Sequence, residues 1–250
     1  MKDEITKILA KECLVNNNTA SMVAHFIECV TEKKSVNSIE EIEEWLQNIK
    51  LNLNAATQKV TLKDVIGEKS GWYFNNETKD LEHVSGGFFK IIGVDVKTDI
   101  RESGSGWKQP MIDQGTESSV AGIIKKIING VPHYLLEGKF EPGNYGEIQI
   151  SPTLQATYSN LNKLHGGRAP RFLEYFDGTK NVEILYEQWL PEDGGRFYKK
   201  RVKNMLVKIA SNEEIMIPFN FIWMTMRQIK EFLRKDNIIN PHVRSIIAHL

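Results

Sequence analysis

The chain has 250 residues, of which 41% are hydrophobic and 26% charged, and its 32 Lys and Arg side chains balance 32 Asp and Glu side chains. This composition is typical of a globular protein with a full core and excludes predominant disorder. A formal net charge of zero argues against a nucleic-acid-binding module and against a polybasic membrane-binding surface.

Neither the apolar stretches nor the cysteines indicate a membrane-spanning or secreted protein. Charged residues interrupt each apolar run before it reaches the roughly 18 residues of a membrane span, and the charged N-terminus lacks the apolar core of a signal peptide. Cys13 and Cys29 are too few for a disulfide framework or a thiolate zinc site, so we expect two reduced, buried thiols. We therefore expect no membrane or nucleic-acid partner and a cytoplasmic location.

Residues 1–60 contain no glycine or proline and are predicted to form a helical N-terminal segment. A first helix is expected over residues 19–31. Ser38 and Glu41 have the spacing of a capping box, and Ile42, Leu46 and Ile49 follow at helical spacing. A second helix is therefore predicted to begin after Ser38.

Most glycines lie between Gly86 and Gly195, where the sequence predicts strands and turns. Asn129-Gly130 is typical of a tight type I′ turn, in which both residues have positive φ, so residues 123–128 and 131–136 are predicted to form a β-hairpin. Further strands are predicted over residues 87–94, 146–150, 182–188 and 198–209.

The C-terminal part is predicted to be helical, since no glycine follows Gly195. Ile222, Met226 and Ile229 repeat at helical spacing, and Asn240-Pro241 is expected to cap a short last helix. The chain is thus predicted to be an α+β protein with a mixed β-sheet core and helical N- and C-terminal segments. Residues 61–250 are expected to form one cooperative unit beside the segment 1–60.

Several cofactor and metal motifs are missing from the sequence. The fragment Gly104-Ser105-Gly106 lacks the third glycine of a dinucleotide-binding turn, and no Walker loop is found. The histidines form no pair at metal-ligand spacing, and no Gly-x-Ser-x-Gly nucleophile motif occurs. The sequence therefore favours chemistry without a redox cofactor, ATP or a catalytic metal.

A dense polar stretch extends from Lys139 to Arg171. Prolines and glycines alternate there with amides and hydroxyls, which suits a pocket that binds a polyhydroxylated ligand. The same residues also suit turns that bond their own backbone, and composition alone favours neither interpretation.

Specific motifs in and around this stretch carry a family resemblance. They are Trp-Lys-Gln-Pro at 107–110, Gln114, Glu-Pro-Gly-Asn at 141–144, the twelve residues Gln-Ile-Ser-Pro-Thr-Leu-Gln-Ala-Thr-Tyr-Ser-Asn at 149–160, His-Gly-Gly at 165–167 and Glu-Asp-Gly-Gly-Arg-Phe at 192–197. In this order they resemble the NDP-hexose 2,3-dehydratase family, from about Trp72 to the C-terminus.

This resemblance implies a lyase that removes water across C2 and C3 of a nucleotide-linked 4-keto-6-deoxyhexose, typically the dTDP form, without a cofactor or metal. It also implies a Nudix-like module. Family members commonly hold two such modules, so for a chain with one module we expect a homodimer. Two alternatives stay open: a nucleotide-sugar-binding or partner subunit without activity, and a cofactor-free keto-sugar epimerase or isomerase.

The resemblance and the residue chemistry together give a set of candidate site residues. Glu141 is the preferred proton acceptor, and His165, with the ordinary histidine pKa of about 6.5, is the next candidate. Tyr158 suits either proton donation or ring stacking, and Lys139 suits the developing enolate. Substrate contacts are expected from Arg101, Trp107, Gln109, Gln114, Asn144, Gln155, Thr157, Asn160 and Arg196, whereas Trp223 is expected in the core.

Overall fold

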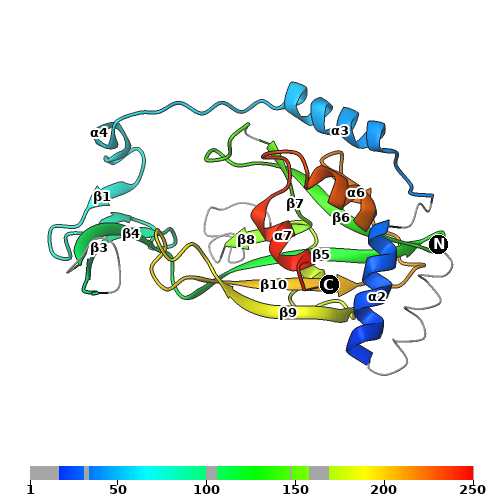
Figure 1. Cartoon of the computed structure of the whole chain (residues 1–250). Coiled ribbons are helices and arrows are strands. Elements are labelled where there is room, and N and C mark those ends of the chain that lie inside the picture. Colours follow the sequence, from blue (N-terminus) through cyan, green and yellow to red (C-terminus); the bar gives the residue numbers. More distant parts are fainter. Residues whose placement is uncertain (1–16, 31–33, 100–105, 147, 158–168, 250) are drawn as a thin grey trace.

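A computed structural model describes residues 17–30, 34–99, 106–146, 148–157 and 169–249 of the chain. Its strands form two separate sheets (Figure 1). The smaller sheet lies at one end of the molecule, and an extended segment, residues 53–61, connects it to the helix that precedes it (Figure 1). The larger sheet carries the hydrophobic core.

The smaller sheet is an antiparallel meander whose four strands are paired in chain order. They are β1 (Trp72–Phe74), β2 (Leu81–His83), β3 (Lys90–Val96) and β4 (Trp107–Asp113). The chain returns to this sheet after β9, because Ile112 of β4 forms a bridge with Phe197 and donates its N–H to Arg196 O at 2.8 Å. The connection between β9 and β10 therefore joins the two sheets.

The larger sheet is mixed and has seven strands. They are β5 (Glu117–Ile128), β6 (Val131–Phe140), β7 (Ile148–Pro152), β8 (Leu154–Thr157), β9 (Glu183–Pro191), β10 (Arg201–Lys208) and β11 (Phe221–Met224). The main order is β11-β6-β5-β10-β9, with β10 parallel to β5 and the other pairs antiparallel. In addition, β7 pairs with β6 and β8 pairs with β5.

The hairpin between β5 and β6 is as predicted. Asn129 and Gly130 have φ of 51° and 76°, the positive values that a type I′ turn requires at both central positions. This two-residue turn sets the register that pairs Ile124 with Leu135. It thereby fixes where the two strands begin to separate.

Helices and a short 3-10 turn cover both faces of the larger sheet. They are α2 (Asn17–Val30), α3 (Ile39–Asn52), η2 (Leu173–Tyr175), α6 (Met226–Phe232) and α7 (Pro241–Ile247), whereas the short helix α4 (Leu62–Val65) lies beside the smaller sheet (Figure 1). One core cluster joins α3, α6 and α7 to the sheet, and a second lies where Phe172 and Tyr175 pack near Leu135. None of the described helices is long and apolar enough to cross a membrane.

Most of the predicted elements are confirmed, and the α+β class is correct. Ser38 and Glu41 form the predicted capping box at the start of α3. The helical prediction at Ile222 is wrong, because Ile222 lies in β11 and pairs with Leu136 of β6. The helix begins only at Met226, where Thr225 and Gln228 form a capping box. The division at residue 60 stays a prediction.

Candidate functional site

Three of the predicted site residues come together at the end of β6. Lys139 Nζ lies 3.5 Å from Glu141 Oε1 and donates to Gln155 O at 3.0 Å. Gln155 Nε2 donates to the same Glu141 oxygen at 3.0 Å. All three side chains are partly buried, so this group offers a carboxylate and an ammonium at the protein surface, each held by hydrogen bonds.

The group lies where β5 and β6 separate. Beyond the Ile124–Leu135 pair, β6 continues against β7 while β5 continues against β8, and Thr153 lies between β7 and β8. The Thr153 hydroxyl accepts from Ile124 N at 3.0 Å and donates to Leu135 O, so it replaces the direct ladder bond between these strands. Since this hydroxyl satisfies both backbone groups, the sheet can divide without leaving them unbonded.

Buried polar atoms without a partner are concentrated around this division. Within the described residues they include Ser119 Oγ, Asn144 Nδ2, Ser151 Oγ, Gln155 Oε1 and Asn204 Oδ1. Asn204, with 1% exposure, and Gln155 lie on either side of Ala121 in one row across β10, β5 and β8. Ser119 lies two residues before Ala121, opposite Thr157. Because nearly all buried polar groups in proteins are hydrogen-bonded, this concentration indicates a place for a polar ligand.

A histidine of α7 adds to the electrostatics of this site. Burial lowers the pKa of His242, while Glu192 and Glu141 act to raise it and Lys200 and Lys139 act to lower it further. The Lys200–Glu192 pair, at 3.5 Å, is in the connection between β9 and β10. His242 is therefore a neutral imidazole near pH 7, within electrostatic reach of the Lys139–Glu141 pair, and can both donate and accept a hydrogen bond.

Glu137 is the second carboxyl on this part of β6. Burial raises its pKa to about 7, against the opposing effects of Lys139, Arg171 and a hydrogen bond from Asn220. The charge of Glu141 raises the pKa of Glu137 further. The site thus contains two carboxyls in different surroundings.

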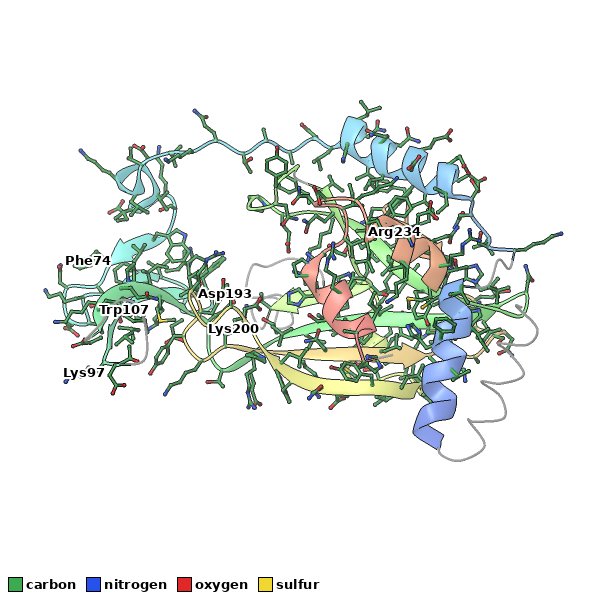
Figure 2. All side chains as sticks on the ribbon, in the orientation of Figure 1. Phe74, Lys97, Trp107, Asp193, Lys200 and Arg234 are labelled. Atoms are coloured by element: carbon green, nitrogen blue, oxygen red, sulfur yellow. The ribbon has the colours of Figure 1, made fainter. Side chains whose placement is uncertain are left out.

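A second group of predicted contacts lies on the smaller sheet. Trp107 Nε1 donates to Gln109 Oε1 at 2.6 Å, and Gln109 Nε2 donates to Gly195 O at 2.9 Å. Arg196 is exposed beside Asp193. Figure 2 places Trp107 on this sheet, with Asp193 and Lys200 on the connection toward the larger sheet. Trp107 and Gln109 lie on β4 of the smaller sheet, whereas Glu141 follows β6 of the larger one, so the structure divides the predicted contacts into two groups.

The other predicted residues are placed in three ways. Gln114 lines a cavity of about 290 Å³ together with Phe88 and Lys90. Asn144 lies in the turn after Glu141, and Thr157 ends β8. Arg101, Tyr158, Asn160 and His165 lie outside the described residues.

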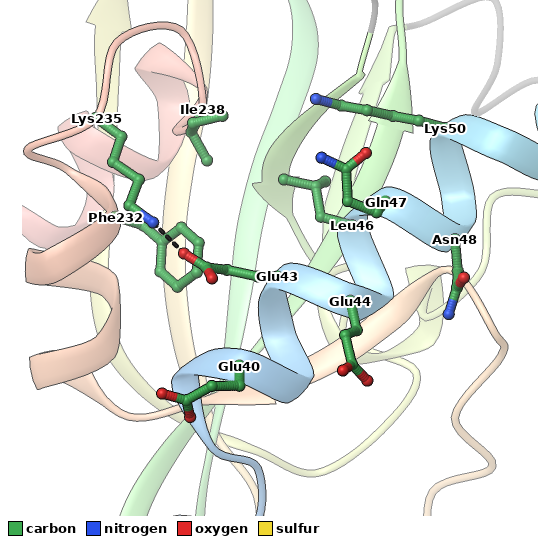
Figure 3. Close-up of a pocket in the computed structure, with 10 residues that line it drawn as sticks. All are labelled: Glu40, Glu43, Glu44, Leu46, Gln47, Asn48, Lys50, Phe232, Lys235 and Ile238. Atoms are coloured by element: carbon green, nitrogen blue, oxygen red, sulfur yellow. Dashed lines mark hydrogen bonds and ion pairs between the residues drawn. The ribbon is translucent and has the colours of Figure 1, made fainter.

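A further cavity, of about 650 Å³, lies between α3 and the end of α6 (Figure 3). Glu40, Glu43 and Glu44 line it, and an ion pair joins two of its lining residues, Glu43 of α3 and Lys235 (Figure 3). It shares no residue with the Lys139–Glu141 group. No group of three or more His, Cys, Asp or Glu side chains within the described ranges is arranged to hold a metal ion.

The sequence analysis did not single out Glu137, Ser151, Asn204 or His242 as site residues. Glu137 had an available signal, since it alternates with Lys139 and Glu141 directly after the predicted strand 131–136. Asn204 had a weaker one, because an amide between Val202 and Leu206 interrupts an apolar strand face. His242 had none, since only the packing of α7 against β5, β7 and β10 brings it close.

A family model described as NDP-hexose 2,3-dehydratase matches residues 39–250 of the chain. The matched region includes every candidate residue described above.

Three curated proteins are similar over most of the chain. A dTDP-4-dehydro-6-deoxy-α-D-glucopyranose 2,3-dehydratase of Saccharopolyspora spinosa is 39% identical over 179 residues, which is 72% of this chain and 36% of that protein. Proteins of the same name from Amycolatopsis orientalis and Streptomyces violaceoruber are 37% and 36% identical, covering 38% and 40% of their own lengths. The chain therefore spans less than half the length of these relatives.

Solved structures with partial similarity include nucleotide hydrolases. An Ap4A hydrolase of C. elegans has a TM-score of 0.35 at 13% identity, covering 54% of this chain and 94% of its own. The Nudix hydrolase RenU of M. smegmatis has a TM-score of 0.31 at 13% identity, covering 63% and 97%. Both TM-scores are below 0.5, so the Nudix-like module stays a prediction.

Proposed function

The chain belongs to the NDP-hexose 2,3-dehydratase family, and from this premise we propose that it removes water across C2 and C3 of a dTDP-4-keto-6-deoxyhexose. The product is a 3,4-diketo-2,6-dideoxy sugar nucleotide. The observation that supports this most directly is the Lys139–Glu141–Gln155 group beside buried polar atoms without partners. Such a site offers a proton acceptor, a cation and hydroxyl-binding groups in one place.

The proposed reaction starts at C3, whose proton is acidic because of the neighbouring C4 ketone. Glu141 removes this proton, and the electron pair forms an enolate. The ammonium of Lys139 stabilises the negative charge that develops, which is most effective in a partly water-excluded site. The C2 hydroxyl then leaves as water, and the resulting enol becomes the diketone.

The remaining residues are proposed as contacts. Gln155, Asn144 and Thr157 lie near Glu141 or on β8, so we assign them to the sugar hydroxyls. Trp107, Gln109, Gln114 and Arg196 belong to the smaller sheet and its connection, and we assign them to the nucleotide end. Arg101 is proposed for the diphosphate, Asn160 for the sugar, and Tyr158 and His165 for proton transfer.

The test is incubation of the chain with dTDP-4-keto-6-deoxyglucose in deuterated water, without nicotinamide and after treatment with a chelator. We expect loss of one water, with solvent deuterium at C2 of the product. Deuterium at C3 of the sugar without loss of water would instead indicate an epimerase or isomerase. Binding without either change would indicate a non-catalytic subunit, and strict dependence on a chelatable metal would contradict the cofactor-free reaction.

We also propose a homodimer. Strand β9 lies at an edge of the larger sheet and is exposed along most of its length, and Ile184 is 54% exposed. Two such edges can pair across a two-fold axis, the commonest symmetry of soluble oligomers. Light scattering should give twice the mass of one chain, and Leu185→Lys on this strand should lower it. A fully active monomer at micromolar concentration would refute the dimer.

A further inference from the structure

Two carboxyls and an ammonium follow one face of β6. Glu137 and Lys139 lie on β6 and Glu141 is the first residue after it, each two residues after the last, and alternate residues of a strand point to the same side. Gly138, between Glu137 and Lys139, faces the opposite side of β6. A Cβ atom added to Gly138 would clash with Ile49 of α3, so α3 covers that side. The two carboxyls therefore lie on the side of β6 that α3 leaves free.

The surroundings of Glu137 keep its carboxyl away from ion pairing. Its Oε1 accepts a hydrogen bond from Asn220 Nδ2 at 3.0 Å, and no ion pair to it is found among the described residues. Ser151 of β7 is paired with Glu137 in the register of the two strands. Its hydroxyl is buried and has no hydrogen-bond partner among the described residues. A polar ligand that reached Ser151 would therefore also reach Glu137.

The charged groups that act on Glu137 are few. They are Lys139 and Glu141 on the same strand and Arg171, which precedes η2. Burial outweighs all three and raises the pKa of Glu137 to about 7. A carboxyl in this condition carries a proton in about half of the molecules at neutral pH.

Glu141 has the opposite kind of neighbours. An ammonium lies 3.5 Å from its Oε1, and the amide of Gln155 donates a hydrogen bond to the same oxygen. Two carboxyls on one strand face, one paired with a cation and one buried without a cation partner, are the arrangement expected of a proton acceptor and a proton donor that work together.

We propose that Glu137 is a catalytic acid of this site, which donates its proton to the C2 oxygen of the sugar as the C2–O bond breaks. This inference rests on the proposed function. It adds a donor that neither the resemblance nor the sequence motifs assigned.

The proton balance closes over one turnover. Glu141 takes the C3 proton, and the electron pair of the C3–H bond forms the enolate. That pair then forms the C2–C3 double bond, the C2–O bond breaks, and the oxygen leaves as water with the proton of Glu137. In the final step Glu141, whose carboxyl proton has exchanged with solvent, protonates C2, and the enol hydroxyl returns a proton to Glu137. One water is lost and both carboxyls regain their starting states.

The deciding experiment separates exchange at C3 from loss of water. In Glu137→Gln the acceptor Glu141 is intact, so exchange of the C3 proton for deuterium should continue while release of water falls by about 10²- to 10⁴-fold. In Glu141→Gln both should fall together. Glu183→Gln, which changes an exposed strand glutamate paired with Lys208, is the matched control and should change neither.

A second variant keeps Glu137 and changes only its hydrogen bond. Asn220→Ala removes a donor that lowers the pKa of Glu137, so this pKa should rise. The alkaline limb of the kcat/KM profile, expected near pH 7 for the wild type, should then move to higher pH. Asn52→Ala removes an exposed amide on α3 and should leave the limb in place.

Two results would overturn the assignment of Glu137. One is release of water by Glu137→Gln at a rate near that of the wild type, and the other is an alkaline limb that Asn220→Ala does not move. Release of water by the wild-type chain is measured before any variant is compared. A wild-type chain that releases no water would contradict the proposed function itself.

Discussion

Gln155 donates a hydrogen bond from Nε2 to Oε1 of Glu141 at 3.0 Å, across the gap that opens between β8 and the end of β6. The two residues are not on paired strands, because Gln155 of β8 is paired with Ala121 of β5, whereas Glu141 follows β6. The bond therefore fixes the carboxylate from the far side of the divided sheet. A precisely oriented acceptor of this kind is what proton removal from carbon requires.

Glu141→Gln is the first prediction for this pair. The amide keeps the size of the side chain and an oxygen that can accept from Gln155, but it cannot take a proton. We expect turnover of the dTDP sugar to fall by about 10²- to 10⁴-fold, with nucleotide binding measured by calorimetry within a few-fold of the wild type. Near-normal turnover would place the acceptor elsewhere, and His165→Asn would then be the next variant to measure.

Lys139→Met removes the ammonium that lies beside Glu141. If this cation stabilises the enolate, kcat should fall by about 10²- to 10³-fold, as when an oxyanion donor is lost, while KM changes little. Lys139→Arg keeps the charge and should recover part of the rate. Lys203→Met, which breaks the ion pair between Lys203 on β10 and Glu187 on β9, is the control. A rise in KM with unchanged kcat would assign Lys139 to substrate binding instead.

The sequence predicted the Lys139–Glu141–Gln155 group because the polar residues are close together in the chain and belong to one motif. Their contacts depend on the hairpin at Asn129-Gly130, whose turn chemistry is local and readable. The sequence did not predict the part of the site that depends on packing. Asn204 and Ser151 are isolated polar residues in apolar strands, and only burial reveals that they lack partners.

The error at Ile222 has a similar cause. Ile222 and Met226 are four residues apart, which fits a helix, but Thr225 between them caps the helix and leaves Ile222 outside it. Pairing of β11 with β6 then stabilises the extended form of residues 221–224. Short apolar runs are ambiguous between helix and strand until the neighbouring strand is known.

Glu137→Gln should also change stability, in a direction that depends on pH. The pKa of Glu137 is raised to about 7 in the folded protein from an ordinary value of 4.5, so between these values only the unfolded chain releases the proton. The free energy of unfolding of the wild type therefore falls as pH rises through this window, by on the order of 1 to 3 kcal/mol.

In Glu137→Gln the side chain at position 137 is uncharged at every pH, so the variant does not lose this unfolding free energy as pH rises. Urea unfolding at pH 8 should show Glu137→Gln to be more stable than the wild type, and the difference should shrink toward pH 5. Glu183→Gln should give no such trend. A variant that is less stable than the wild type at pH 8 would show that Glu137 stabilises the fold as a carboxylate, contrary to the buried, protonated form inferred here.

Thr153→Val tests whether one hydroxyl holds the divided sheet together. Thr153 is 1% exposed, and valine has nearly the same shape, so the change leaves Ile124 N–H and Leu135 C=O buried with the hydroxyl bonds removed. Each unsatisfied group costs roughly 1–3 kcal/mol, so the loss in unfolding free energy should exceed that of an ordinary surface substitution several-fold. Thr153→Ser keeps the hydroxyl, deletes one methyl and should cost only about 1 kcal/mol. Because Gln155 follows Thr153 by two residues, the valine variant should also lower turnover, and the serine variant should not. Equal stability of the two variants in chemical denaturation would mean that the strands close the gap by pairing directly, and that β7 and β8 are held in place by their ladders alone.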